Sequence, residues 1–389
     1  MQTDVLIIGQ GICGTFLSRE LERAGLSYVV IDEERPLTAS RAAAGLINPV
    51  TGRRLVKTWM IDELLSFVQD QYWQMGEELG ASFLRPARVV DFFPTPQMRL
   101  AFLRRYEEDP AGYLHPPEDE GDWRDRFSYD FGYGLIDSCY LVDIQGLLSS
   151  VRRRMVARGV LRAERFDLQE LTVEPTRVRY MDVEARWTIF CDGIESMQNE
   201  YFSRLPFAPN KGEVLVVEAP GLALPEAVAG ERGRSRERPI SEAGAMSEGA
   251  AGMGGNRSVP GMVFKKGMSL APWKEGLFWV GSSYEWSFAD AGPTAAFRER
   301  TEAVLREWLR VPFRVVEHIA AVRPATLERR PFVGFHPLYP AVGILNGMGT
   351  KGCSLAPYFA RQLVQLMVSG VAIQADADIL RFRKVLGRG

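Results

Sequence analysis

The sequence predicts an α/β protein of two domains, one built on a βαβ unit and a second α+β domain built on an antiparallel sheet. Three observations predict this fold. The chain has 389 residues, more than one hydrophobic core usually covers. A strand, a glycine turn and a helix follow one another at the N-terminus, and this order returns near the C-terminus. Short strand-like segments separated by turn residues fill the middle of the chain.

The first part of the chain indicates the βαβ unit. An apolar strand ends at Ile8, and a helix is expected from about Ile12 to Ala24 because apolar side chains recur there at helical spacing. A second strand is expected at 28–31. A GxGxxG sequence joins the first strand to the helix, and this order is typical of a Rossmann-like dinucleotide-binding domain.

Gly9, Gly11 and Gly14 are the glycines of that turn. A pyrophosphate approaches a backbone closely only where side chains are absent, and the helix amides then stabilise its charge. Asp32 directly follows the second strand, where an acidic residue binds ribose hydroxyls, and Glu33 is a second candidate. Because an acid at this place repels the extra phosphate of NADP, the sequence favours FAD or NAD.

A second glycine turn lies near the C-terminus, between a strand at 341–345 and an apolar helix from about Leu355 to Val368. The amides at the start of such a helix can stabilise negative charge on a reduced flavin ring. The residues of this turn that we expect to face the cofactor are Gly347, Gly349, Thr350 and Gly352.

The chain is expected to pass between the two domains more than once. Aromatic residues, prolines and acids mark the segment 87–140, while Gly, Ala, Ser, Glu and Arg dominate 231–258, which we interpret as a mobile insertion. The expected domains are 1–80, 141–205 and 315–389 for cofactor binding, and 81–140 with 206–314 for a cap over the substrate.

Composition excludes several classes of function. The 47 basic and 49 acidic residues give a net charge of −2, which disfavours a dedicated nucleic-acid binder. The four cysteines and three histidines are far apart and lack the spacing of metal ligands, so no metal site is expected. The chain shows neither an export signal nor a run of 18 apolar residues, which favours a cytoplasmic protein without a membrane span.

Several segments together resemble the superfamily of D-amino acid oxidase, glycine oxidase and sarcosine oxidase, which are FAD-dependent amine oxidoreductases. The N-terminal βαβ unit has the spacing of this family. The small-residue segment 40–49 is similar to the one that passes beside the flavin, and Cys191-Asp-Gly193 is similar to a glycine motif that ends a strand. Arg323-Pro-Ala-Thr and Pro331-Phe-Val-Gly334 resemble elements that precede the closing glycine turn.

The resemblance implies FAD as the cofactor. No cysteine lies near Arg323–Gly343, where sarcosine oxidase relatives attach the flavin covalently, so non-covalent FAD is expected unless Cys353 attaches it. The family reaction implies hydride transfer from a small amine or amino acid to flavin N5, with hydrolysis of the imine product and reoxidation by oxygen or a quinone-like acceptor. The further residues expected to bind FAD are Ser40, Arg41, Ala44, Gly45, Leu46 and Gly193.

Four residues are candidates for the chemistry itself. Arg323 matches the family position proposed to hold a substrate carboxylate, although an arginine there can also be structural. A cation at Lys351 would stabilise reduced flavin or the carboxylate, or equally point into solvent. One at Lys265 would favour oxygen as acceptor, although a solvated lysine beside a strand is the simpler interpretation there. Tyr284 offers a phenol for hydrogen bonding, or simply packs.

Other functions remain open from the sequence. The same scaffold can oxidise a 2-hydroxy acid, because that hydride chemistry is similar. A tRNA-linked amine is a further alternative, since Gly281-Ser-Ser-Tyr-Glu285 resembles a segment of a tRNA-modifying branch of the superfamily. A different class is a non-catalytic, flavin-bound scaffold that recruits partners through 231–258.

Overall fold

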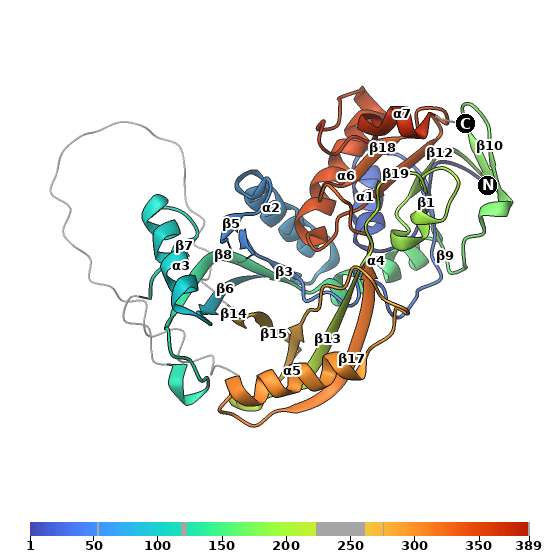
Figure 1. Ribbon diagram of the computed structural model, residues 1–389. Coiled ribbons are helices and arrows are strands. Elements are labelled where there is room, and N and C mark those ends of the chain that lie inside the picture. The colour runs from blue at the N-terminus through green and yellow to red at the C-terminus, as the bar shows by residue number, and fades with distance from the viewer. Residues whose placement is uncertain (53, 118–122, 223–260, 275, 388–389) are drawn as a thin grey trace, which may run out of the picture.

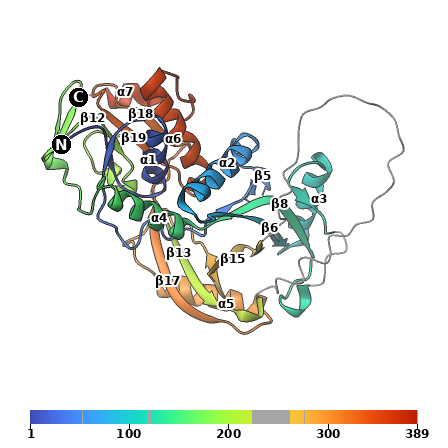
Figure 2. The ribbon, with the colours of Figure 1, turned by 180° about the vertical axis from the view of Figure 1, so that it is seen from behind.

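Two β-sheets organise the chain, as the ribbon of the computed structural model shows (Figure 1). The structure describes residues 1–389 except 53, 118–122, 223–260, 275 and 388–389, so the insertion expected at 231–258 lies outside the described residues. Both chain termini lie beside the first sheet, at the end of the molecule far from α3 (Figures 1 and 2).

The first sheet has eight strands in the order β10-β11-β12-β1-β2-β9, with β19 beside β12 and β18 beside β19. Strand β1 runs parallel to both β2 and β12, and β12 runs parallel to β19. The expected βαβ unit is therefore confirmed. The strands are β1 (Gln2–Ile8), β2 (Tyr28–Ile31), β9 (Leu161–Arg162), β10 (Leu171–Val173), β11 (Val178–Tyr180), β12 (Val183–Phe190), β18 (Phe332–Phe335) and β19 (Val342–Asn346).

The second sheet has nine strands in the order β17-β13-β16-β15-β14-β6-β8-β3, with β7 beside β8. Its pairs are antiparallel except for β6 with β14. A two-stranded ribbon, β4 (Val50–Thr51) with β5 (Val56–Lys57), lies apart. The strands of the large sheet are β3 (Leu46–Ile47), β6 (Leu84–Phe92), β7 (Leu114–His115), β8 (Tyr133–Val142), β13 (Asn210–Glu218), β14 (Gly261–Lys266), β15 (Met268–Lys274), β16 (Leu277–Gly281) and β17 (Arg314–Arg323).

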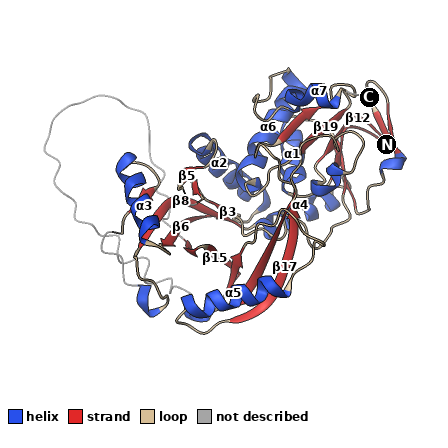
Figure 3. Ribbon diagram, viewed as in Figure 1, coloured by secondary structure: helices blue, strands red, loops and turns tan. Residues whose placement is uncertain are grey.

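The helices divide between the sheets (Figure 3). One large apolar cluster joins side chains of α1, α2, α4 and α6 to the first sheet, whereas α5 packs on the second sheet through Phe297, Leu305 and Trp308. The helices expected in the first domain are confirmed within a few residues. The α-helices are α1 (Ile12–Arg23), α2 (Ile61–Leu79), α3 (Pro96–Glu108), α4 (Ile144–Ala157), α5 (Ala295–Trp308), α6 (Gly352–Ser369) and α7 (Arg383–Leu386).

Strand β17 differs from its expected place. It lies almost wholly within 315–389, which the sequence assigned to the cofactor-binding domain, but it pairs with β13 along nearly its full length. The physical reason is the free edge of β13, whose backbone amides and carbonyls need partners that a neighbouring strand supplies. The chain therefore returns to the first sheet only at β18 and β19.

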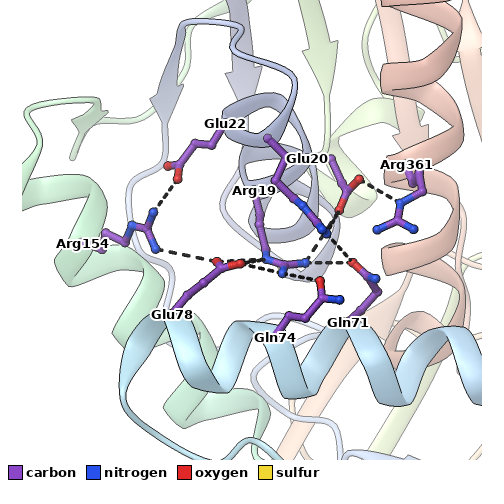
Figure 4. Close-up of polar contacts among 9 residues, drawn as sticks. Arg19, Glu20, Glu22, Gln71, Gln74, Glu78, Arg154 and Arg361 are labelled. Atoms are coloured by element: carbon purple, nitrogen blue, oxygen red, sulfur yellow. Dashed lines mark hydrogen bonds and ion pairs between the residues drawn. The ribbon is translucent and has the colours of Figure 1, made fainter. Parts of the chain in front are cut away.

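A polar network buried between helices holds α1 against α2 and α6 (Figure 4). Arg19 of α1 is 5% exposed and donates from Nη2 to Glu78 Oε1 at 2.7 Å and from Nη1 to Gln71 Oε1 at 2.8 Å. Glu20, also buried, accepts from Arg361 Nε of α6 at 3.1 Å. These bonds satisfy charges that would otherwise be costly inside the helix layer.

Replacement of Arg19 by Met is expected to lower the free energy of unfolding by about 3 kcal/mol, because it leaves buried acceptors without their donor. Denaturant unfolding measures the change. The matched control is Arg104→Met, which removes an exposed pair with Glu108 and is expected to cost less than about 0.5 kcal/mol. Equal effects of the two substitutions would contradict the role given to the network.

Candidate active site

A cavity of about 2020 Å³ extends from the first sheet to the second. Ile8, Ile31 and Phe190 line it, and each is the last residue of its strand in β1, β2 or β12. The cavity thus opens at the carboxyl ends of parallel strands, where α/β sheets bind ligands. The second sheet supplies the opposite wall through β3, β6, β13, β14, β15, β16 and β17.

The first glycine turn lies on the cavity wall through Gly9 and Gly11. Gly9 has φ +96°, and a Cβ there would lie 2.7 Å from the carbonyl oxygen of Cys191. Gly14, which we expected to bind the cofactor, does not line the cavity. A Cβ at Gly14 would lie 2.0 Å from the Gly9 carbonyl oxygen, so this glycine allows α1 to pack closely on the turn.

Asp32 lines the cavity at the end of β2, as does Glu33. The Asp32 carboxylate accepts from the Gln10 backbone amide at 2.8 Å and from Arg152 Nη1 at 2.6 Å. Arg152 comes from α4 and is 7% exposed, so it fixes the carboxylate from behind. Sequence reasoning missed this arginine because 120 residues separate the pair.

The segment expected beside the flavin also lies on the wall. Ser40 Oγ accepts from the Ile12 amide at 3.1 Å, which places the hydroxyl at the start of α1. Gly45 has φ +76°, and a Cβ there would lie 2.0 Å from the Val142 carbonyl oxygen, so β8 requires this glycine. The expected residues of this segment that line the cavity are Ser40, Arg41, Ala44, Gly45 and Leu46.

The second glycine turn, at 347–352, reaches the cavity at the start of α6. Gly347 is an exception: it does not line the cavity, and its missing Cβ makes room for Thr326 Cγ2, which would be 2.8 Å away. Gly193 does line the cavity, and Asn346 Nδ2 holds its carbonyl oxygen at 2.8 Å. The other expected residues of this turn that line the cavity are Gly349, Thr350 and Gly352.

Polar atoms without partners indicate that this part of the cavity suits a polar ligand. Within the described residues, Asn199 Nδ2 and Glu164 Oε1 are buried and have no hydrogen-bond partner, and both residues line the cavity. Burial raises the pKa of the nearby lining residue Asp192 to about 7, although the Ser196 hydroxyl donates to it. An unmet amide donor and an unmet carboxylate acceptor suit the polar adenosine part of FAD.

Arg323 lies on the second-sheet wall, at the end of β17. Its guanidinium donates to Asn210 Oδ1 and to Ser282 Oγ, each at 2.7 Å, and lies 5.0 Å from the centre of the Tyr284 ring. A Cβ at Gly212 would lie 1.9 Å from Arg323 Nη2, so the guanidinium occupies the space above this glycine. Burial lowers the pKa of Arg323 from its ordinary value.

The two candidate lysines line the same cavity as Arg323 and Tyr284. Lys351 Nζ donates to Thr58 Oγ1 at 3.0 Å, and burial together with the charge of Arg329 lowers the pKa of Lys351 to about 8. Lys265 instead forms an ion pair with Asp91, whose carboxylate oxygen lies 2.6 Å from Nζ.

The described residues also bear on metal binding and on membrane crossing. No group of three or more His, Cys, Asp or Glu side chains in the described ranges is arranged to hold a metal ion. None of the helices described combines the length and the apolar character that crossing a bilayer requires.

Comparison with known proteins gives consistent matches. The family model DAO, FAD dependent oxidoreductase, matches residues 4–366. A glycine oxidase of Pseudomonas aeruginosa is 23% identical in an alignment 383 residues long that covers 94% of this chain and 95% of the relative.

Solved structures show the same fold. The iminodiacetate oxidase of Chelativorans sp. BNC1 has a TM-score of 0.69 at 20% identity, covering 96% of this chain and 98% of its own. The glycine oxidase of Geobacillus kaustophilus has a TM-score of 0.71 at 14% identity, with 98% of each chain covered.

Substitution of Arg152 by Met is expected to weaken FAD binding about tenfold, because Asp32 loses the charged donor that fixes its carboxylate. Titration of the apoprotein with FAD, followed by quenching of flavin fluorescence, measures the affinity. Arg153→Met is the matched control, since Arg153 is the next residue of α4, is exposed, and has the Ser150 hydroxyl as its one recorded partner. An unchanged affinity in the Arg152 variant would show that Arg152 does not support FAD binding by fixing the Asp32 carboxylate.

Proposed function

Because the chain belongs to the family of FAD-dependent oxidoreductases, we propose that it oxidises the carbon–nitrogen bond of a small amine or amino acid. FAD is the cofactor of this family, and the enzyme class follows from it. The names of the similar proteins, glycine oxidase and iminodiacetate oxidase, support an amine that carries a carboxylate.

The observation that carries the proposal is the set of hydrogen-bond partners of the Arg323 guanidinium. Its recorded hydrogen-bond partners are neutral oxygens of Asn210, Ser282 and Ser283, and no described acid forms an ion pair with it. A half-buried cation such as Arg323 is costly without a counter-charge, and a ligand carboxylate compensates for that cost. Because a guanidinium binds a carboxylate through two parallel hydrogen bonds, Arg323 would also orient the amine.

The remaining wall residues have separable tasks in this proposal. The turn at Gly9 and Gly11, together with Asp32, would hold the phosphates and ribose of FAD, and the start of α6 would lie near its ring. When bound, FAD supplies the acceptor for the electron pair that leaves the substrate. Lys351 Nζ places a positive charge at that helix start, and the phenol of Tyr284 can donate to a substrate oxygen.

Anaerobic absorption spectra test the reaction class. Pooled amino acids and N-methyl amino acids are expected to bleach the flavin bands of the purified enzyme, whereas 2-hydroxy acids leave them unchanged. Bleaching by hydroxy acids alone would replace carbon–nitrogen oxidation with the alternative reaction. Absence of bleaching by every donor would point to the non-catalytic scaffold, whose expected binding segment 231–258 lies outside the described residues.

Arg323→Met is expected to raise KM for a carboxylate-bearing amine by about 100-fold, because the charged hydrogen bonds to the carboxylate are lost. Steady-state kinetics on a substrate found by bleaching measure the effect. The matched control is Arg314→Met, at the opposite end of β17, where the side chain is exposed and pairs with Glu218. A similar KM in both variants would show that Arg323 does not hold the substrate.

The affinity of the loaded enzyme for a carboxylate inhibitor is expected to fall as pH rises through about 8, where Lys351 loses its proton. Lys351→Arg should keep the charge and remove this step, and Lys351→Met should give low affinity at every pH.

Unfolding of the protein does not explain such a loss of inhibitor affinity. The lowered pKa means that the unfolded chain binds more protons between pH 8 and 10.5, so this group makes stability rise with pH there.

Non-covalent attachment of FAD is part of the proposal. Cys353 lines the cavity, but burial raises the pKa of its thiol to about 12, which disfavours the reactive thiolate. Acid precipitation should therefore release all of the FAD into the supernatant. Flavin that stays with the precipitate would identify a covalent link.

We also propose a cytoplasmic protein that uses oxygen or a quinone-like acceptor. The four cysteines are all free and buried, which suits a reducing compartment. Release of hydrogen peroxide during turnover in air would identify oxygen as the acceptor. Turnover only with an added quinone would identify a dehydrogenase.

A further inference from the structure

A row of paired residues crosses the second sheet beneath the cavity and ends at the ion pair of Lys265 with Asp91. In the strand register, Val214 of β13 pairs with Gly281 of β16, Gly281 with Ser269 of β15, Ser269 with Lys265 of β14, and Lys265 with Asp91 of β6. All five residues line the cavity. Gly281 and Ser269, in the middle of this row, have small side chains and therefore take up little of the cavity between Arg323 and Lys265.

Lys265 is the accessible member of its ion pair. Its side chain is 22% exposed, whereas that of Asp91 is 5% exposed. The ammonium group has three donors, and Asp91 is its only recorded partner among the described residues. Donors therefore remain for a ligand in the cavity.

The surroundings of Lys265 favour a negative ligand group. Thr95, Gln97 and Met98 also line the cavity, and they lie at the N-terminal end of α3, where the helix dipole adds partial positive charge. Asp91 is the one acid that the described part of the second sheet contributes to the cavity wall, against the two cations Lys265 and Arg323.

We infer that the substrate carries a second, distal carboxylate that binds Lys265 while Arg323 holds the carboxylate next to the amine. This inference rests on the proposed function. Three strand spacings, about 14 Å, separate the backbone of β13, over which Arg323 lies, from that of β14, which carries Lys265. With each cationic group taken to lie over its strand, hydrogen bonds of about 3 Å at each end leave roughly 8 Å between the carboxylates. The substrate class is thus an elongated amino dicarboxylate, of about the length of 2-aminopimelate, and glycine is too short.

Binding of unreactive acids tests this class without requiring turnover. Pimelate and heptanoate have the same chain length, and only pimelate has two carboxylates. The FAD-loaded enzyme is expected to bind pimelate at least about tenfold more tightly, as measured by calorimetry and by the change in the flavin spectrum. Lys265→Met should abolish this preference.

Two further variants keep the result interpretable. Lys266→Met is the matched control, because the neighbouring ammonium donates to the Ser128 carbonyl oxygen and does not line the cavity. The double variant Asp91→Asn with Lys265→Met removes both charges, so that no unpaired carboxylate remains buried. The control should keep the preference for pimelate, and the double variant should lose it.

The outcomes separate this inference from the proposed function. Equal affinities for the two acids, or a preference that survives in both Lys265 variants, overturn the inference even if amines bleach the flavin. Slower reoxidation by oxygen in Lys265→Met, with the preference intact, assigns Lys265 to the acceptor and also overturns it. A preference lost as expected, without oxidation of any amine, overturns only the proposed reaction. Oxidation of 2-aminopimelate with a higher kcat/KM than 2-aminoheptanoate supports both.

Discussion

The close packing of α1 against the turn that precedes it is the constraint on which the cofactor side of the structure depends. Gly14 lies so near the Gly9 carbonyl that no side chain fits between them. Only this approach brings the start of α1 to the carboxyl end of β1, where Ser40 and the turn backbone line the cavity. The buried network around Arg19 then holds the far end of the same helix against α2 and α6.

The second sheet supplies the opposite wall, on which Arg323 and Lys265 are the cations. Gly212 gives the space in which the Arg323 guanidinium lies, and neutral partners fix its direction without neutralising it. Lys351 enters from the first domain, where burial lowers its pKa. The wall is thereby organised for anions before any ligand binds, which is how an active site stabilises charge without reorganising at the moment of reaction.

Two packing roles and two omissions show where sequence reasoning stopped. Gly14 and Gly347 were expected to contact the cofactor; neither lines the cavity, and their missing side chains allow close packing against Gly9 and Thr326. A GxGxxG pattern does not distinguish these uses, because both require the absence of a Cβ. Arg152 and Asn199 were missed, since neither belongs to a local motif and each becomes relevant only through residues that the fold brings close.

The sequence by itself determined the βαβ unit and the glycine turns, because these depend on short-range periodicity and on backbone conformations that few residues allow. The family followed from the resemblance of its motifs, and the family model confirms it. The sequence also placed the Arg-Pro element at Arg323. The tertiary structure alone decided that β17 joins the second sheet, that Arg152 holds Asp32, and that Arg323 and Lys265 share one cavity wall. Strand order and register set these contacts, and they arise from pairing between segments far apart in the chain, which no local pattern records.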